Sequence, residues 1–339
     1  MTILNLNLND PLMKALKTVN SIGGKSLTEE DLKRQRSSME LAGRLAAPSD
    51  DVTVTPFTFG EGKGALPCEW VKPELAHNPN YIILYAHGGG YTCGGLSYAR
   101  ILAAKLATAT GFSVVSFEYR LAPEHTYPAQ LEDCESVWTY LKKKGYKENQ
   151  IILAGDSAGG NLVLCLTQKL LAKKKTMPRM LLLFSPWTDM TATAKSYEKY
   201  EGKDPILNKE FILGVRGAYV LGKEGSAEQA GAKESADAAV KAGADPVDFA
   251  APQFSPLYGD FSGFPTTYIQ VGKNEVLHDD STSLYKKLKK AGAKAELDVE
   301  QDGWHVYQQM PLPVAGRAMK RLSEFVSHEL YGEEIMQAR

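Results

Sequence analysis

The chain carries near its middle the stretch Ile151-Ile152-Leu153-Ala154-Gly155-Asp156-Ser157-Ala158-Gly159-Gly160. A short apolar run, a Gly-x-Ser-x-Gly pentapeptide and then apolar residues at helical spacing predict a strand, a sharp turn and a helix, with a serine at the turn. This arrangement is a nucleophile elbow. Glycines at positions 155 and 159 remove side chains that would collide where the strand and the helix pass close together. A chance pentapeptide in a glycine-rich loop is the alternative, and the flanking strand and helix argue against it.

Apolar runs and helical patterns alternate on both sides of the elbow. Strands are predicted at 81–86, 112–117, 180–184, 266–271 and 295–300, and helices at 100–110, 129–144, 281–291 and 315–330. Two earlier strands, 52–59 and 66–71, show period-two alternation and are expected to pair in antiparallel fashion. Strands alternating with helices indicate parallel βαβ crossovers, so the sequence predicts an α/β fold with a mostly parallel sheet and helices on both faces.

Two segments do not follow this alternation. Residues 1–47 show two helical patterns separated by Gly23-Gly24, the second of which begins near Thr28. Residues 189–256 hold a helical pattern at 208–221 and then an Ala-, Gly- and Glu/Lys-rich run at 222–251, which has few large apolar residues and is expected to bury little. We therefore expect a catalytic domain of residues 48–188 and 257–339, with a helical cap or lid formed by 1–47 and 189–256.

Composition excludes several classes of function. The 339 residues carry a formal net charge of -1, so the chain lacks the excess of positive charge that binding to nucleic acid or to an anionic membrane requires. No apolar run approaches the roughly 18 residues of a membrane-spanning helix. The N-terminus lacks the basic and apolar regions of a secretory signal. The four cysteines lack metal-ligand spacing, so we expect reduced thiols and a cytoplasmic protein.

A serine at an elbow needs a histidine base that is itself held by a carboxylate. Among six histidines, His305 follows the last predicted strand, where a loop at the carboxyl edge of the sheet would place it beside the elbow. The chain order nucleophile, acid, histidine selects it. Of the other five, His77 and His125 precede the serine and His87 belongs to a glycine motif. His278 adjoins the region expected to hold the acid, and His328 lies on the last predicted helix.

The acid is expected in the loop after the strand at 266–271. Glu275 leads into the apolar pair Val276-Leu277 and is our choice. Asp279 is the second candidate, although Asp279 and Asp280 directly precede a predicted helix, where N-capping is the usual role of a carboxylate. A glutamate can accept the imidazole N–H, hold the tautomer and stabilise the imidazolium as well as an aspartate can.

Acyl transfer also needs N–H donors for the developing oxyanion. The run His87-Gly88-Gly89-Gly90-Tyr91 follows the strand at 81–86, and successive glycines let backbone N–H groups turn inward. We expect Gly88 and Gly89 to donate from this loop and Ala158 to donate at the elbow. His87 is expected to brace the loop by hydrogen bonding. A flexible turn is the alternative.

Together these motifs resemble a known family. His87-Gly88-Gly89-Gly90, Tyr119-Arg120-Leu121-Ala122-Pro123-Glu124, the elbow sequence and His305 are similar, in order and at reasonable spacing, to the hormone-sensitive-lipase-like carboxylesterases of the α/β-hydrolase fold. The resemblance implies a serine carboxylesterase for short to medium acyl esters, with a small-molecule substrate and no metal or organic cofactor. It implies a cap of N-terminal helices plus an insertion, and it is compatible with a homodimer. It also implies that Tyr119 and Glu124 support the oxyanion loop, with Gly90 and Asp156 as further supporting residues.

The chain departs from the family pattern in two places. Many members carry Asp-Pro-Leu where this chain has Glu275-Val276-Leu277, which fits a glutamate variant, and Asn274 cannot serve as the acid. The run at 222–251 is longer than the family leads us to expect.

Two other functions remain open from the sequence. One is a non-catalytic receptor of the same fold, against which the presence of both Ser157 and His305 counts. The other is an amidase or peptidase with the same triad. Four aromatic residues are candidates to line an acyl or alcohol pocket, with ordinary core packing as the alternative: Trp187, Tyr91, Phe211 and Trp304.

Overall fold

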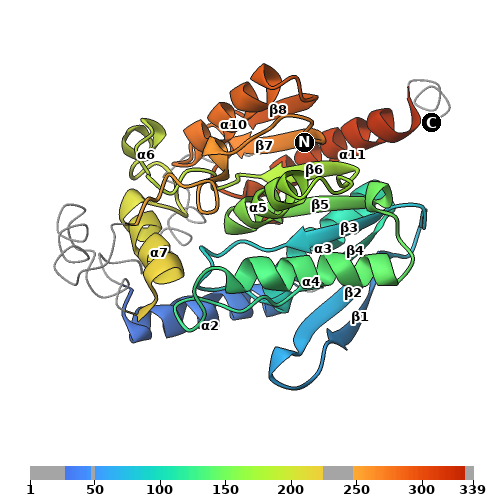
Figure 1. The fold of residues 1–339 in the computed structure, drawn as a ribbon, viewed down its shortest axis with the longest axis horizontal. Helices are drawn as coiled ribbons and strands as arrows, with labels where there is room; N and C mark the ends of the chain where they lie inside the picture. Colours follow the sequence, from blue (N-terminus) through green and yellow to red (C-terminus); the bar gives the residue numbers. More distant parts are fainter. Residues whose placement is uncertain (1–26, 47–49, 224–246, 333–339) are drawn as a thin grey trace.

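One sheet of eight strands runs through the computed structural model, which describes residues 27–46, 50–223 and 247–332 (Figure 1). The strand order is β1-β2-β4-β3-β5-β6-β7-β8. The strands are β1 (Val52–Phe59), β2 (Leu66–Pro73), β3 (Ile82–Ala86), β4 (Ser113–Phe117), β5 (Ile151–Asp156), β6 (Met180–Phe184), β7 (Thr266–Gly272) and β8 (Ala295–Glu300). β1 and β2 are antiparallel to their neighbours, and the remaining six strands are mutually parallel. The predicted α/β fold with a mostly parallel sheet is confirmed.

The central strands are apolar runs because both of their faces are covered. Every residue of β3, β4, β5 and β6 is buried, as is typical of parallel strands between two helical layers. Their parallel register brings the carboxyl ends of β5, β6, β7 and β8 to the same edge of the sheet. The loops that follow these four strands therefore share one edge, and they carry Ser157, Ser185, Glu275 and His305.

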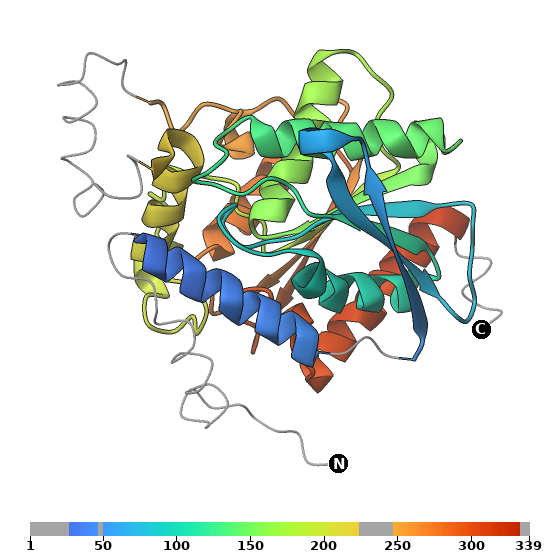
Figure 2. The ribbon, with the colours of Figure 1, turned by 90° about the horizontal axis from the view of Figure 1, so that it is seen from below.

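Helices form a layer on each face of the sheet. One layer is α3 (Leu96–Thr110) and α11 (Pro313–Tyr331), and the other is α4 (Ala129–Lys143), α5 (Ala158–Ala172) and α10 (His278–Lys290) (Figure 2). Successive strand residues alternate between the two cores, so that Ile83 packs with the first layer and Ile82 and Leu84 pack with the second. This alternation is the period-two geometry of a strand.

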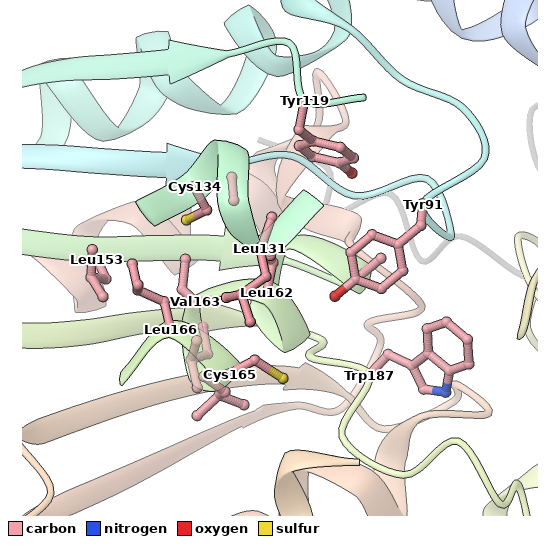
Figure 3. Close-up of a cluster of buried hydrophobic side chains, with 14 of the residues drawn as sticks. Tyr91, Tyr119, Leu131, Cys134, Leu153, Leu162, Val163, Cys165, Leu166 and Trp187 are labelled. Carbon is pink, nitrogen blue, oxygen red and sulfur yellow. The ribbon is translucent and has the colours of Figure 1, made fainter. Parts of the chain in front are cut away.

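The core beside the elbow joins α5, α4 and β5. Leu162, Val163 and Leu166 of α5 pack with Leu153 of β5 and Leu131 of α4 (Figure 3). Truncation of a buried leucine such as Leu162 to alanine costs about 2–5 kcal/mol in proteins of this kind. The same core holds the thiols of Cys134 and Cys165 (Figure 3), and the four cysteines are free and buried. This packing fixes the start of α5, and with it the position of Ser157.

Three helices lie outside the βα alternation: α2 (Glu29–Leu45), α6 (Ser196–Lys199) and α7 (Lys209–Leu221). Thr28 begins α2 as predicted, because its side chain accepts from the N–H of Asp31 while Asp31 accepts from the N–H of Thr28. Asn208 caps α7 in the same manner by accepting from the N–H of Phe211 at 2.7 Å. Both α2 and α7 lie at one end of the sheet, at the left of Figure 1.

Two helices begin earlier than predicted, and two predicted segments lie partly or wholly outside the described residues. α3 begins at Leu96, after Gly95, rather than at 100, and α10 begins at His278 rather than at 281. The helix predicted before Gly23-Gly24 and most of the run at 222–251 lie outside the described residues. Within the described ranges, every helix is too short or too polar to span a membrane.

Candidate active site

Ser157 lies in a strained turn between β5 and α5. Its backbone has φ of 52° and ψ of −119°, a combination that costs a non-glycine residue about 1–3 kcal/mol and persists only where the surroundings enforce it. A Cβ atom at Gly159 would collide with the carbonyl oxygen of Ala86, and one at Gly155 would collide with the backbone of Gly159. These glycines allow β5, β3 and α5 to approach closely, which holds Ser157 at the carboxyl edge of the sheet.

Glu275 and His305 meet at this edge from the loops after β7 and β8. Glu275 Oε1 lies 3.6 Å from His305 Nδ1, and both side chains are buried. Within the described part of the chain, neither of these two atoms has a hydrogen-bond partner. The separation is longer than a hydrogen bond, as is common for catalytic pairs without a substrate, which tighten in the bound complex.

Ser185, after β6, links the two loops and was not predicted from the sequence. Its hydroxyl donates to Glu275 Oε2 at 2.9 Å and accepts from the N–H of Val306 at 3.1 Å. The N–H of Gly272 also donates to Glu275 Oε2, at 2.8 Å. Glu275 is thus held through one oxygen, which leaves the other directed at His305. The only sequence signal for Ser185 is its position directly after a buried strand.

Burial shifts the pKa values of both groups. Burial raises the pKa of Glu275, and the hydrogen bonds from Gly272 and Ser185 oppose the rise. Burial lowers the pKa of His305, and the negative charges of Asp204 and Asp156 oppose the fall. A histidine with a lowered pKa is neutral near pH 7 and can accept a proton. His305 therefore has the protonation state that a general base requires.

The glycine loop after β3 requires one correction. The N–H of Gly88 donates to Asp156 Oδ1 at 2.8 Å, and the hydroxyl of Tyr85 donates to the same oxygen at 2.6 Å. The prediction that Gly88 supplies an oxyanion donor is therefore wrong, because its N–H is already bonded to a buried carboxylate. Gly89 and Gly90 instead line the cavity that contains Ser157. Both have positive φ, 113° and 60°, which glycine adopts without strain.

His87 and Tyr119 hold this loop from behind. His87 Nδ1 lies 2.7 Å from the carbonyl oxygen of Gly88, and the Tyr119 hydroxyl donates to the carbonyl oxygen of His87 at 2.8 Å. The two rings are stacked with centroids 4.2 Å apart. Burial lowers the pKa of His87 to about 4. A neutral, buried imidazole in these contacts can brace the loop.

Glu124 is bound by Arg36 of α2, a residue that no sequence motif marks. The Arg36 guanidinium donates to both Glu124 oxygens, at 2.8 and 2.7 Å, and to the carbonyl oxygens of Thr92 and Ala122, at 2.8 and 2.9 Å. Thr92 follows the glycine loop closely, and its N–H donates to the carbonyl oxygen of Gly89 at 3.1 Å. A helix from the N-terminal segment is thereby fixed to the loop that faces Ser157.

The other carboxylates near the acid loop are directed elsewhere. Asp279 Oδ2 accepts from the N–H of Ser196 at 3.0 Å, and Asp280 Oδ2 accepts from the N–H groups of Thr188 and Asp189 at 2.7 and 2.9 Å. Asp279 and Asp280 lie inside the first turn of α10, so the prediction that they precede and cap this helix is wrong. They instead hold the segment that follows β6.

A cavity of about 230 Å³ opens onto Ser157 and His305. Of the four predicted aromatic residues, Trp187 and Phe211 line it, whereas Tyr91 stacks on Tyr219 in the core and Trp304 packs in the opposite layer. The remaining wall comes from α2, the glycine loop and the start of α3, the segment that leads into α7 and the start of that helix, and the loop after β8. It consists of Gln35, Ser38, Met39, Ala42, Gly89, Gly90, Cys93, Tyr98, Ile206, Leu207, Ile212, Val306, Gln309 and Met310. A mostly apolar cavity with a serine and a histidine at one end suits a small apolar ligand with one polar reacting group.

The site has no metal-binding character. In the described ranges, no group of three or more His, Cys, Asp or Glu side chains is arranged to hold a metal ion. The chemistry that these residues can perform is nucleophilic attack by a serine, with proton transfer through a buried histidine and charge stabilisation by backbone N–H groups.

Comparison with known proteins places these features in context. A family model described as alpha/beta hydrolase fold matches residues 83–309. An esterase of Acinetobacter venetianus is 32% identical over 286 residues, which cover 84% of this chain and 85% of that protein. An acetyl-hydrolase of Streptomyces hygroscopicus is 29% identical over 85% of this chain and 86% of that protein. The crystal structure of an esterase from the bacterial hormone-sensitive lipase family superposes with a TM-score of 0.78 at 30% identity, over 95% of this chain and 99% of that one.

Proposed function

Since the chain belongs to the hormone-sensitive-lipase-like esterases of the α/β-hydrolase fold and is a carboxylic ester hydrolase, we propose that Ser157, His305 and Glu275 hydrolyse short to medium acyl esters through an acyl-enzyme. The observation that carries the proposal is that Ser157 and His305 line one cavity while buried Glu275 lies behind His305. The cavity volume of about 230 Å³ is below the roughly 300–1,000 Å³ typical of drug-sized ligands, which favours small acyl groups.

The first half of the reaction acylates the serine. Ser157 Oγ attacks the ester carbonyl carbon while the free ring nitrogen of His305 takes the hydroxyl proton. The imidazolium that forms is stabilised by Glu275 through Nδ1. Collapse of the tetrahedral intermediate breaks the bond to the alcohol oxygen, and His305 returns the proton to that oxygen. The alcohol leaves and an acyl-Ser157 ester remains.

The second half repeats these steps with water. His305 removes a proton from water as the water oxygen attacks the acyl carbon, and the proton then returns to Ser157 Oγ as the carboxylic acid is released. In both halves the oxyanion is stabilised by the N–H groups of Gly89, Gly90 and Ala158. Gly90 replaces Gly88 in this assignment, because Gly88 donates to Asp156.

We also propose that the segments 1–47 and 189–256 act as a cap over a catalytic domain of 48–188 and 257–339. Support comes from the cavity wall, which includes Met39 of α2 and Leu207 and Phe211 of the second segment. The run at 222–251 lies mostly outside the described residues, and its role as a lid stays a prediction. Deletion of residues 222–251 should change the acyl-chain preference or the KM. Unchanged kinetics across an ester series would show that this run is not part of the cap.

A panel of p-nitrophenyl esters of increasing acyl length, run beside the matched anilides, tests the reaction. We expect the shortest acyl groups to give the highest kcat/KM and the anilides to react far more slowly. Ser157→Ala and His305→Ala should each lower kcat about 10⁴-fold or more, and Ser262→Ala, at an exposed serine, serves as the matched control. Retention of most activity by Ser157→Ala, or preference for the anilides, would contradict the proposal.

A further inference from the structure

Asp204 is a buried carboxylate that the triad does not include. It lies in the segment between β6 and β7, shortly before α7, and its side chain is only 5% exposed. A carboxylate is rarely buried without compensating contacts, because loss of hydration is costly for the charged form. The contacts that hold Asp204 therefore indicate what its burial achieves.

The two oxygens of Asp204 bond to different parts of the site. Oδ1 accepts from the N–H groups of Ile206 and Leu207 at 2.9 and 3.2 Å, and both of these residues line the cavity. Oδ2 accepts from the N–H of Val276 at 3.1 Å, the residue directly after Glu275. One carboxylate thus connects the cavity wall to the loop that carries the acid.

The charge of Asp204 also acts on His305. Glu275, from the loop after β7, lies 3.6 Å from His305. The negative charges of Asp204, from the inserted segment, and of Asp156, from the end of β5, also act on the His305 pKa. Burial raises the pKa of Asp204 to about 6, with the charge of His305 opposing the rise and that of Glu275 adding to it. In return, Asp204 is the largest of the influences that raise the pKa of His305 against burial.

We propose that Asp204 is a positioning residue that holds the Glu275 loop and the cavity wall in fixed positions relative to each other. It also supplies a second negative charge to the His305 imidazolium. This inference rests on the proposed function of the triad. The reaction forms an imidazolium twice in a buried site, and Glu275 alone approaches it only to 3.6 Å. A nearby anion stabilises that cation, and a loop displaced by about 1 Å can lower the rate of a preorganised site by about 100-fold.

The test compares Asp204→Asn with Asp189→Asn by pH profiles of kcat and of kcat/KM. Asp189 is a matched control because it is a buried aspartate of the same segment whose Oδ1 also accepts from a residue two positions on, Thr191, at 2.8 Å. Asparagine at position 204 can keep the local turn but carries no charge. We expect Asp204→Asn to lower the plateau kcat by roughly 10- to 100-fold, whereas Asp189→Asn should stay within about twofold of the wild type.

The acid limb of the profile separates an electrostatic role from a merely structural one. Removal of the Asp204 charge lowers the pKa of His305, so the neutral base persists at lower pH and the acid limb should move down by at least roughly half a pH unit. Asp204→Glu keeps the charge, so the acid limb of its pH profile should stay at the wild-type pH even though its plateau kcat falls. This variant also serves if Asp204→Asn does not fold, as judged from its melting temperature.

Three results would overturn the inference. The first is a plateau kcat of Asp204→Asn within twofold of the wild type, and the second is an acid limb of Asp204→Asn at the wild-type pH. The third is an acid limb of Asp204→Glu that moves down as far as is expected for Asp204→Asn. Ser157→Ala is measured in parallel. An active Ser157→Ala would refute the proposed triad itself, whereas an inactive Ser157→Ala beside a wild-type-like Asp204→Asn refutes only the role of Asp204.

Discussion

Replacement of Glu275 by glutamine isolates the charge of the acid. Glutamine has the same shape, and its side-chain oxygen can still accept from the Ser185 hydroxyl and the Gly272 N–H that now bond to Glu275 Oε2. The amide nitrogen would then face His305 Nδ1 in place of Oε1. Asp279→Asn is the matched control, because Asp279 adjoins the same loop but accepts from the N–H of Ser196 in the segment after β6.

The separation of the pair sets the expected magnitude. At 3.6 Å, an anion and a cation attract by on the order of 4 kcal/mol for an effective dielectric constant of about 20. A loss of that size in the transition state, where His305 is an imidazolium, corresponds to roughly 10³-fold in kcat. The value is close to the roughly 10⁴-fold effect of the aspartate-to-asparagine change in serine protease triads. Asp279→Asn should change kcat by less than about threefold.

Stopped-flow acylation with a short p-nitrophenyl ester measures the step on which the charge acts. We expect the acylation rate of Glu275→Gln to fall by about 10³-fold, while KM changes little and the melting temperature stays near that of the wild type. A fall of less than tenfold in a folded Glu275→Gln protein would refute the assignment of the acid. A larger loss in Asp279→Asn than in Glu275→Gln would transfer the role to Asp279.

Three further changes probe the surroundings of the site. Arg36→Ala should lower kcat about tenfold and Arg36→Lys by less, because lysine keeps the charge but cannot bond to both Glu124 oxygens; equal activity of all three proteins in the ester assay would contradict this. Burial raises the pKa of Asp280 to about 8, so the folded chain keeps a proton that unfolded aspartate loses near pH 4. Its contribution to the unfolding free energy is therefore present at low pH and lost as the pH rises towards 8. Asp280→Asn should reduce the decline in urea-measured stability between pH 5 and 8 by on the order of 2 kcal/mol, and an unchanged slope would refute the argument. Gly159→Ala should destabilise the fold by more than about 4 kcal/mol, because the new methyl group would collide with the carbonyl oxygen of Ala86; a near-native denaturation midpoint would contradict that.

The fold was predictable because its signals are local. Each buried parallel strand is an apolar run, and each helix between strands has its own periodicity, so the order of elements follows from short windows of sequence. The shifts occur where local signals are weak. α6 has four residues, too few for a helical period, and α10 starts three residues early within a polar first turn that resembles a loop.

The site was only partly predictable because several of its hydrogen bonds join residues that are far apart in the sequence. Ser157, His305 and Glu275 follow from chain order and from loops at one edge of the sheet. The contact between Gly88 and Asp156 joins residues far apart in the chain, so nothing near Gly88 signals that its N–H is occupied. Arg36 and Asp204 are likewise ordinary charged residues in sequence, and only their contacts across the fold relate them to the site.

The face that α2 presents to the cavity has a practical consequence for engineering. Gln35, Ser38, Met39 and Ala42 all line the cavity, and their spacing of three and four residues places them along one stripe of a single helix. One synthetic DNA cassette encoding eight consecutive codons could therefore randomise an entire wall of the binding chamber. Such a library would leave the sheet, the elbow and the loops that carry the reaction unaltered, which makes this helix an economical starting point for the directed evolution of new acyl preferences.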